Sequence, residues 1–197
     1  MDKEKRIVTS AIQLFKEQGI DKIKIADIVK RAGIAQGTFY LYFPSKMSLM
    51  PAIAKVMVDN IFEAIQKNVD EQATLVEKFK QLIDTIFMMT REHKELVAII
   101  YAGLSASDYL KDWVNAYTPY YNWLKKELDG AKSKGEILLA IDSYSTAKMV
   151  FGLIEAAAER AYLFDSKDEV LIDADKKDLL EFICNALILN NAVAKKA

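Results

Sequence analysis

The apolar residues of the first 50 positions recur with helical spacing and are interrupted by glycines. Residues 3–18 carry one apolar stripe, which Gly19 follows as a stop signal. The same spacing predicts a short helix over 25–32 that ends at Gly33, and another from about 35 to 41. The chain therefore begins with three short helices, and a tight glycine turn joins the last two.

The rest of the chain shows the same period in longer stretches. The predicted helices are 46–68, 74–91, 92–104, 108–134, 143–164, and a last one from Asp173 or Asp175 to about 193. Pro51 and Pro119 should bend their helices or mark a first turn, and Thr74-Leu-Val-Glu77 is a capping box. No strand pattern or repeat interrupts the series. We expect an all-α chain of about nine helices, with a three-helix domain over 1–46 and a helical bundle over 47–197.

Composition supports a helical protein in a reducing compartment. The 197 residues are 52% hydrophobic and include only seven Gly and three Pro. The single Cys184 cannot form an internal disulfide, and together with the single His93 it makes no metal cluster, so no metal or cofactor is expected. The first 15 residues include acidic side chains and no sustained apolar run, so we expect no signal peptide, and no apolar run is long enough for a membrane span. These features predict a cytoplasmic protein with no membrane partner.

Charge is divided unevenly along the chain. Residues 1–50 hold nine Lys/Arg and five Asp/Glu, a net +4, whereas the remaining residues carry a net −5. A basic head on an acidic body is compatible with a head that meets a polyanion, although many solvated surfaces vary this much.

The two short helices around Gly33 have the form of a helix-turn-helix, whose second helix enters the DNA major groove. Gly33 suits a left-handed turn that a Cβ would penalise. The second helix opens with small or polar residues that let the backbone approach DNA, and Gln36 and Thr38 can reach base edges. Tyr40 and Tyr42 can donate to phosphates. A glycine-centred helical hairpin alone is more often plain structure.

Residues 25–46, IADIVKRAGIAQGTFYLYFPSK, closely resemble the signature of the TetR family of transcriptional repressors. The resemblance, with the helix before Gly19, covers about 50 residues and implies phosphate contacts from Tyr40, Tyr42 and Lys46. It implies base-proximal positions for four residues of the second helix: Gln36, Gly37, Thr38 and Leu41. It also implies a homodimer that binds a palindromic double-stranded DNA operator and a small-molecule inducer that releases it, in a bacterial cytoplasm and at the nucleoid when bound to DNA.

Two positions depart from the family pattern. Lys24 and Ala35 stand where the family usually has a Ser or Thr that caps each of the two helices. Losing such a cap typically costs ~1 kcal/mol. Lys24 is a further candidate phosphate contact, or an ordinary exposed lysine. Leu41 replaces a commonly polar residue, so no base preference can be borrowed from a relative.

Aromatic residues are dense in the second half: Trp113, Tyr117, Tyr120, Tyr121 and Trp123 fall within eleven positions. They pack a core, or they line a cavity for a small, largely apolar or aromatic ligand. The resemblance favours a cavity, for which the candidates are Met88, Tyr101, Trp113, Tyr117, Tyr120, Tyr121, Phe151 and Glu155. A carboxylate at Glu155 would favour a cationic ligand, whereas the simpler alternative has Glu155 and Glu159 facing solvent, one of them paired with Arg160 or a lysine.

The last two predicted helices carry apolar stripes with several small residues. By analogy with the family they form the dimer interface, with Ile154, Ala158, Ala161, Leu180, Ile183 and Leu187 as candidates. The alternative is that these stripes close the chain's own core.

Two other classes of protein remain as rivals. An enzyme is disfavoured because one histidine supports no Ser/His/Asp set, and no phosphate-binding glycine loop or metal-ligand spacing occurs. We expect no catalytic residues. A purely structural helical module would explain the body, but not the Gly-Thr-Phe-Tyr and Phe-Pro-Ser-Lys segments.

Overall fold

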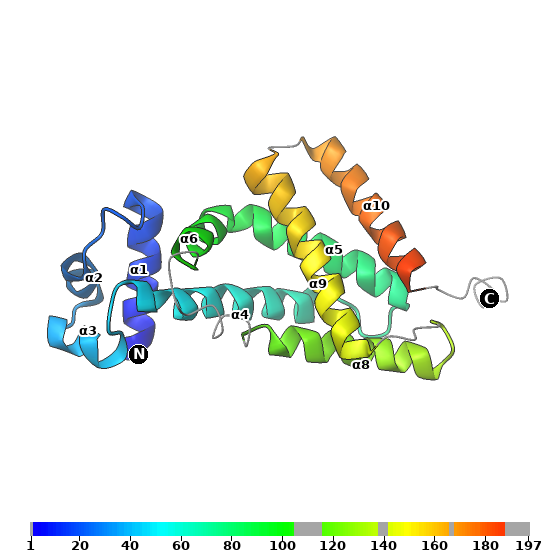
Figure 1. The fold of residues 1–197 in the computed structure, drawn as a ribbon, viewed down its shortest axis with the longest axis horizontal. Coiled ribbons are helices and arrows are strands. Elements are labelled where there is room, and N and C mark those ends of the chain that lie inside the picture. Colours follow the sequence, from blue (N-terminus) through cyan, green and yellow to red (C-terminus); the bar gives the residue numbers. More distant parts are fainter. Residues whose placement is uncertain (1, 105–115, 138–141, 166–167, 188–197) are drawn as a thin grey trace. The chain divides into compact units, whose positions relative to one another are not determined.

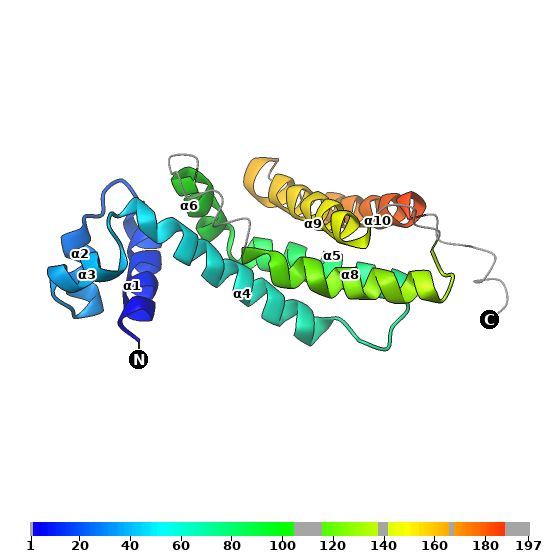
Figure 2. The ribbon, with the colours of Figure 1, turned by 60° about the horizontal axis from the view of Figure 1, so that its bottom comes forward.

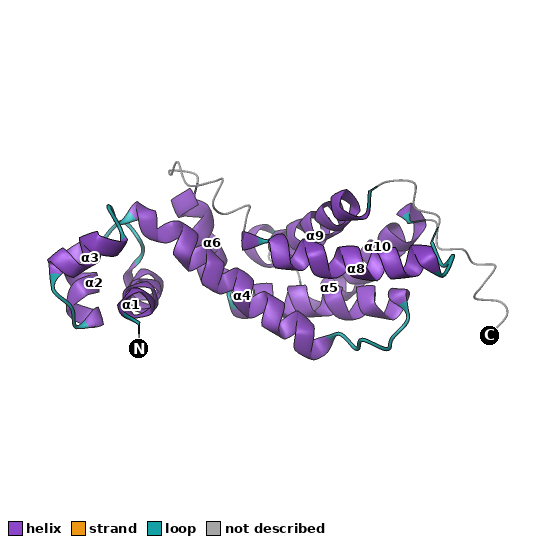
Figure 3. Cartoon of the chain, turned by 90° about the horizontal axis from the view of Figure 1, so that it is seen from below, coloured by secondary structure: helices purple, strands orange, loops and turns teal. Residues whose placement is uncertain are grey.

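A computed structural model describes residues 2–104, 116–137, 142–165 and 168–187. In these ranges the chain is all-α, and helices joined by loops account for the coloured segments of Figure 3. It divides into two compact units. The head unit comprises Met1–Asn60 and His93–Ala116, and the body unit comprises Ile61–Glu92 and Tyr117–Ala197.

The head unit begins with the three short helices that the sequence predicts: α1 (Lys3–Gln18), α2 (Ile25–Ala32) and α3 (Gln36–Tyr42) (Figure 1). A 3₁₀ turn (Met47–Leu49), the first part of α4 (Met50–Asn68) and α6 (Lys94–Leu104) complete it. The predicted apolar stripe of α1 is buried, and so are Ile28 of α2 and Phe39 of α3. The buried residues of the stripe are Ile7, Ala11, Leu14 and Phe15. α6 packs on α1, so packing divides the chain within α4 and not at residue 46.

The body unit is a bundle of long helices. It contains α5 (Leu75–Glu92), α8 (Thr118–Ser133), α9 (Ser143–Glu159) with a π turn after it (Arg160–Phe164), and α10 (Glu169–Ala186). α9 packs against α8 and α5, and α10 packs against α5, as Figure 2 shows. The largest buried side chains in this bundle are Phe79, Phe87, Tyr120 and Phe151.

Several helix boundaries differ from the sequence predictions, and α8 begins at Thr118, inside the helix predicted over 108–134. Lys46 precedes a 3₁₀ turn, and α4 starts only at Met50; Pro51 and Pro119 then fall in the first turns of α4 and α8, where no intrahelical donor is lost. The last helix starts earlier than Asp173, because Asp168 caps it by accepting from the Leu171 N–H at 2.9 Å. The predicted helical residues 108–115 and 188–193 lie outside the described residues. None of the described helices is long and apolar enough to cross a membrane.

Candidate functional site

The turn between α2 and α3 is fixed by main-chain bonds and one arginine. Gly33 has φ +63°, and the N–H groups of Gly33 and Ile34 donate to the carbonyls of Lys30 and Val29 at 3.3 and 3.1 Å. This Schellman arrangement ends α2. Arg6 of α1 donates to the carbonyls of Ala32 and Gly33. Sequence reasoning missed Arg6, because the apolar pattern marks it only as a residue beside the buried stripe.

The two departures from the family pattern leave both helices without a side-chain cap from the preceding residue. The Lys24 backbone N–H donates to Asp27 Oδ2 at 2.9 Å, but the exposed lysine side chain supplies no acceptor. Ala35 likewise supplies none to α3. α2 is instead held to α1 by Arg31, whose two terminal nitrogens donate to the Glu17 carboxylate at 2.6 and 2.8 Å. The bonds from Arg31 hold the pKa of Glu17 below its ordinary value.

α3 presents an unusual outer surface. Phe39 is fully buried and Phe43 nearly so, which anchors the helix to the head unit. Between and beside them, Leu41 is 83% exposed, Tyr40 50% and Tyr42 40%. Gln36 and Gly37 are exposed as well, and Thr38 is half-buried. The predicted DNA-facing residues of α3 are thus exposed, apart from the half-buried Thr38, and their contacts with bases and phosphates stay predictions.

Lys46 has a role that its sequence position did not reveal. Its Nζ donates to the carbonyls of Ile20 and Ile23 at 2.7 and 2.9 Å, so it closes the loop between α1 and α2. An ammonium has three donors, and these bonds use two of them. The predicted phosphate contact therefore rests on the third N–H.

In the body unit the structure brings five of the eight predicted ligand residues together. Tyr120 is fully buried, with its ring centroid 5.2 Å from that of Phe151 and 5.4 Å from that of Tyr117. Tyr121 stacks on Tyr117 at 6.0 Å, and Glu155 accepts a hydrogen bond from the Tyr117 hydroxyl. We call these five residues the aromatic cluster.

The other three predicted ligand residues have different positions. Met88 is half-buried on α5. Tyr101 belongs to the head unit and has half of its surface exposed, and Trp113 lies outside the described residues.

Glu155 is the chemically unusual member of the aromatic cluster. Desolvation of its carboxyl and repulsion from Glu159 raise its pKa to about 8, and the hydrogen bond from Tyr117 only partly opposes this. Burial and the charge of Glu155 raise the pKa of Tyr117 above its usual range and that of Tyr121 to about 12. The simpler alternative placed Glu155 and Glu159 in solvent, with one of them paired with Arg160 or a lysine. Both side chains are half-buried, no described cation pairs with Glu155, and Arg160 pairs with Asp165 at 3.2 Å.

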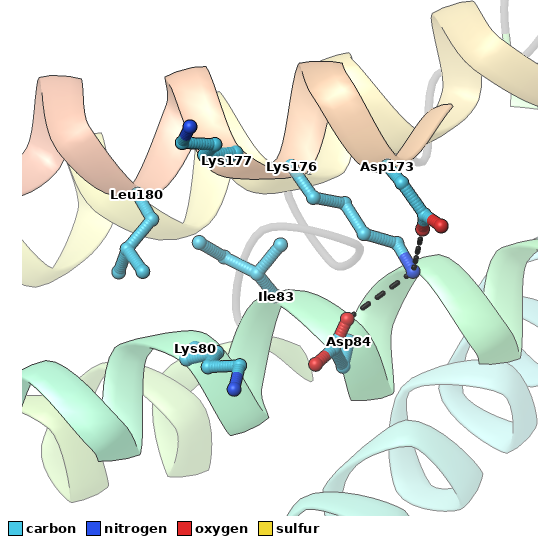
Figure 4. Close-up of a pocket in the computed structure, with 7 residues that line it drawn as sticks. All are labelled: Lys80, Ile83, Asp84, Asp173, Lys176, Lys177 and Leu180. Carbon is cyan, nitrogen blue, oxygen red and sulfur yellow. Dashed lines mark ion pairs between the residues drawn. The ribbon is translucent and has the colours of Figure 1, made fainter. Parts of the chain in front are cut away.

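A separate groove of about 330 Å³ lies between α5 and α10 (Figure 4). Ile83 and Leu180 point toward one another in it, and Lys176 crosses its side to pair with Asp84 at 3.2 Å and Asp173 at 3.6 Å. Lys80 and Lys177 complete the lining. The groove contains no predicted ligand residue, and Leu180 was a predicted interface residue.

The residues chosen for the dimer interface are mostly internal to the chain. Five of them are buried in the body unit's own core and leave almost no surface for a second chain: Ile154, Ala158, Ala161, Ile183 and Leu187. That choice of residues needs correction, because the apolar stripes of α9 and α10 close the chain's own bundle. The same helices carry other apolar side chains on the outside, including Met149 and Phe182, each 63% exposed.

Comparisons with known proteins agree over both halves of the chain. The family described as bacterial regulatory proteins, tetR family, matches residues 7–53, and the tetracyclin repressor-like C-terminal domain matches residues 79–187. The uncharacterized HTH-type transcriptional regulator YvdT of Bacillus subtilis is 37% identical over 185 residues, which cover 94% of this chain and 95% of the relative. The fatty acid metabolism regulator protein of the same organism is 26% identical, covering 92% and 94% of the two chains.

Solved structures have the same fold. FadR from Bacillus subtilis, in complex with stearoyl-CoA, superposes with a TM-score of 0.71 at 25% identity, covering 91% of this chain and 96% of that one. GusR from Salmonella enterica superposes with a TM-score of 0.72 at 21% identity, covering 94% and 95%. Family, relatives and helix-turn-helix geometry converge, and the chain belongs to the TetR family of bacterial transcriptional regulators, with a helix-turn-helix DNA-binding domain at its N-terminus.

Proposed function

We propose that this regulator is a ligand-responsive repressor that binds a palindromic DNA operator as a homodimer and leaves it when a small molecule binds the body unit. The observation that carries the proposal is the outer surface of α3. An exposed leucine between two exposed tyrosines is costly on an isolated surface, but suits a helix that enters the major groove, where apolar side chains meet thymine methyl groups and hydroxyls meet phosphates.

The dimer is proposed to form through the outer faces of α9 and α10. Met149 and Leu153 on α9, and Leu171 and Phe182 on α10, are exposed apolar side chains outside the core of the bundle. Burying them against a second copy about a two-fold axis would pair two α3 helices for a palindrome.

Ligand control is proposed to work through two states of the dimer with different spacing of the α3 helices. A ligand shifts such an equilibrium only through unequal affinity for the two states. The helix α4 begins in the head unit and ends in the body unit, so it is the proposed relay. The aromatic cluster suits a small ligand with a largely apolar or aromatic body.

The test is binding of the purified protein to DNA upstream of its own gene, followed by fluorescence anisotropy at several salt concentrations. We expect affinity to fall steeply with salt, and Tyr42→Phe to weaken binding about tenfold by removing one phosphate hydrogen bond. Lys46→Ala should lower the salt slope by about one. Tyr101→Phe, at a tyrosine of similar exposure on α6, is the matched control and should bind like the wild type.

A protein that binds this DNA no better than a scrambled fragment, or a Tyr42→Phe variant with unchanged affinity, would contradict the assignment of α3. Because a relative of known structure is bound to stearoyl-CoA, that compound is one arm of the release experiment, in which the ligand is added to the preformed DNA complex.

A further inference from the structure

Glu155 is a half-buried acid whose carboxyl is desolvated and, among the described residues, lacks a balancing cation. Among the described residues no Lys, Arg or His forms an ion pair with it, and its hydrogen bond comes from the neutral hydroxyl of Tyr117. The charged group that acts on it is a second acid, Glu159, one turn further along α9. A buried carboxyl without a cation costs stability, and an uncharged side chain of similar size would avoid that cost.

The aromatic rings around Glu155 differ in how far they are covered. Tyr120 and Phe151 are fully buried and close the inner side of the aromatic cluster, whereas Tyr117, Tyr121 and Glu155 are only partly covered. On its outer side the cluster already attracts an ammonium group. Lys148 Nζ lies 4.8 Å from the ring centroid of Tyr144 and 5.7 Å from that of Tyr121, in the geometry of a cation–π contact.

We propose that Glu155, together with the rings of Tyr117 and Tyr121, recognises an organic cation with an apolar or aromatic body. This inference rests on the proposed function, because it names the class of inducer that the aromatic cluster takes. The cation packs against the ring faces and sits beside the Glu155 carboxyl. As it binds, the carboxyl gives its proton to solvent and becomes the carboxylate counter-ion, so one positive charge arrives and one leaves.

The same arrangement disfavours anions. A carboxylate or phosphate ligand beside the rings would meet the Glu155 carboxyl, with which no described Lys, Arg or His forms an ion pair. Charge, and not only apolar area, therefore decides which ligands the aromatic cluster accepts.

The test compares two ions of the same shape and opposite charge, tetraphenylphosphonium and tetraphenylborate, by isothermal titration of the full chain. We expect the cation to bind at least about tenfold more tightly than the anion. Its affinity should rise by up to about tenfold per pH unit between pH 6 and 8, the limit for release of one proton. The other titratable groups that act on Glu155 are Tyr117 from the start of α8 and Glu159 from α9, and the tyrosine stays neutral over that range.

Substitutions distinguish the contribution of the Glu155 carboxyl to cation binding from that of the aromatic rings. Glu155→Gln keeps the shape of the side chain and should weaken binding of the cation at least about tenfold and remove its pH dependence. Glu63→Gln, at an exposed acid on α4, is the matched control and should change neither. Tyr117→Phe keeps the ring and should bind the cation within about threefold of wild type, whereas Tyr117→Leu should bind it more weakly.

Equal affinity for the two ions, or cation binding that Glu155→Gln leaves unchanged, would overturn the inference. DNA binding is measured on the same samples. Operator binding that stearoyl-CoA releases and the cation does not would refute the inference and leave the repressor proposal standing. Cation selectivity in a protein that binds no DNA would refute the repressor proposal and leave the inference about the ligand standing.

Discussion

The charged side chains of the helix-turn-helix and of the aromatic cluster have opposite surroundings. In the head unit, Arg6 and Lys46 donate to main-chain carbonyls. The outward-facing side chains of α3, Tyr40, Leu41 and Tyr42, are exposed. In the body unit, the rings of Tyr120 and Phe151 are buried, and the desolvated carboxyl of the half-buried Glu155 lies beside them. The hydrogen bonds in the head unit fix the conformation of its loops, whereas the Glu155 carboxyl in the body unit can gain or lose a proton.

This difference predicts that the two regions respond to different variables. The bonds that fix the turn between α2 and α3 all end on main-chain carbonyls, so we expect its geometry to be insensitive to pH. The aromatic cluster should be sensitive to it, because Glu155 binds its proton more tightly in the folded chain than in the unfolded one.

The largest effect that we expect is therefore a pH-dependent loss of stability from Glu155. Its pKa is raised from 4.5 to about 8, so between these values the folded state holds a proton that the unfolded state has released. Stability must fall as the pH rises through this window, by about 2 kcal/mol between pH 6 and 8. Urea unfolding at the two pH values measures the difference, and Glu155→Gln should abolish it.

Glu63→Gln serves again as the control and should keep the wild-type dependence. If wild type and Glu155→Gln lose stability in parallel from pH 6 to 8, the carboxyl is not enclosed in the folded protein, and the contrast between the two regions disappears.

A smaller effect is expected at the turn, where two glycines only four positions apart should respond oppositely. A Cβ at Gly33 would be strained at φ +63° and would lie 2.9 Å from Arg6 Nη2, so Gly33→Ala should cost about 1–2 kcal/mol of unfolding free energy. Gly37 is helical, and a methyl group added to it would meet nothing within 4 Å, so Gly37→Ala should stabilise by about 0.5–1 kcal/mol.

Measuring DNA binding of the same variants then distinguishes an effect on stability from an effect on the DNA interface. Gly37→Ala should weaken operator binding despite its higher stability, because the methyl group stands on the surface that approaches DNA. Thermal unfolding and anisotropy on the same samples decide this. A Gly37→Ala variant that binds the operator like wild type would remove Gly37 from the interface.

Sequence reasoning succeeded where structure is local. The bounds of α1 and α2, the left-handed Gly33 and the burial of Phe39 and Phe43 follow from patterns within a few residues. It failed where partners are distant in sequence. No pattern links Arg6 with Ala32, 26 positions away, or Lys46 with Ile20.

The body unit illustrates the same limit. The aromatic residues of the cluster were recognised by density alone, but the state of Glu155 depends on α8 and α9 packing together. The apolar stripes of α9 and α10 were correctly identified as buried faces, but periodicity cannot say whether the chain's own helices or a second copy covers them. Ile154 and Ile183 are covered by the chain itself.

The smallest expected effect concerns the start of α3, where Ala35 leaves the helix without a side-chain cap. Ala35→Ser supplies an acceptor for a first-turn N–H and should stabilise the protein by about 0.5–1 kcal/mol in urea unfolding. Ala35→Val, which adds bulk without an acceptor, is the control and should not stabilise. Because a serine would also fix the first turn of the helix that meets DNA, operator affinity should rise with stability in Ala35→Ser. A stabilised variant with unchanged affinity would mean that α3 is already as ordered in the free protein as it is on DNA, so that the missing cap affects the fold alone.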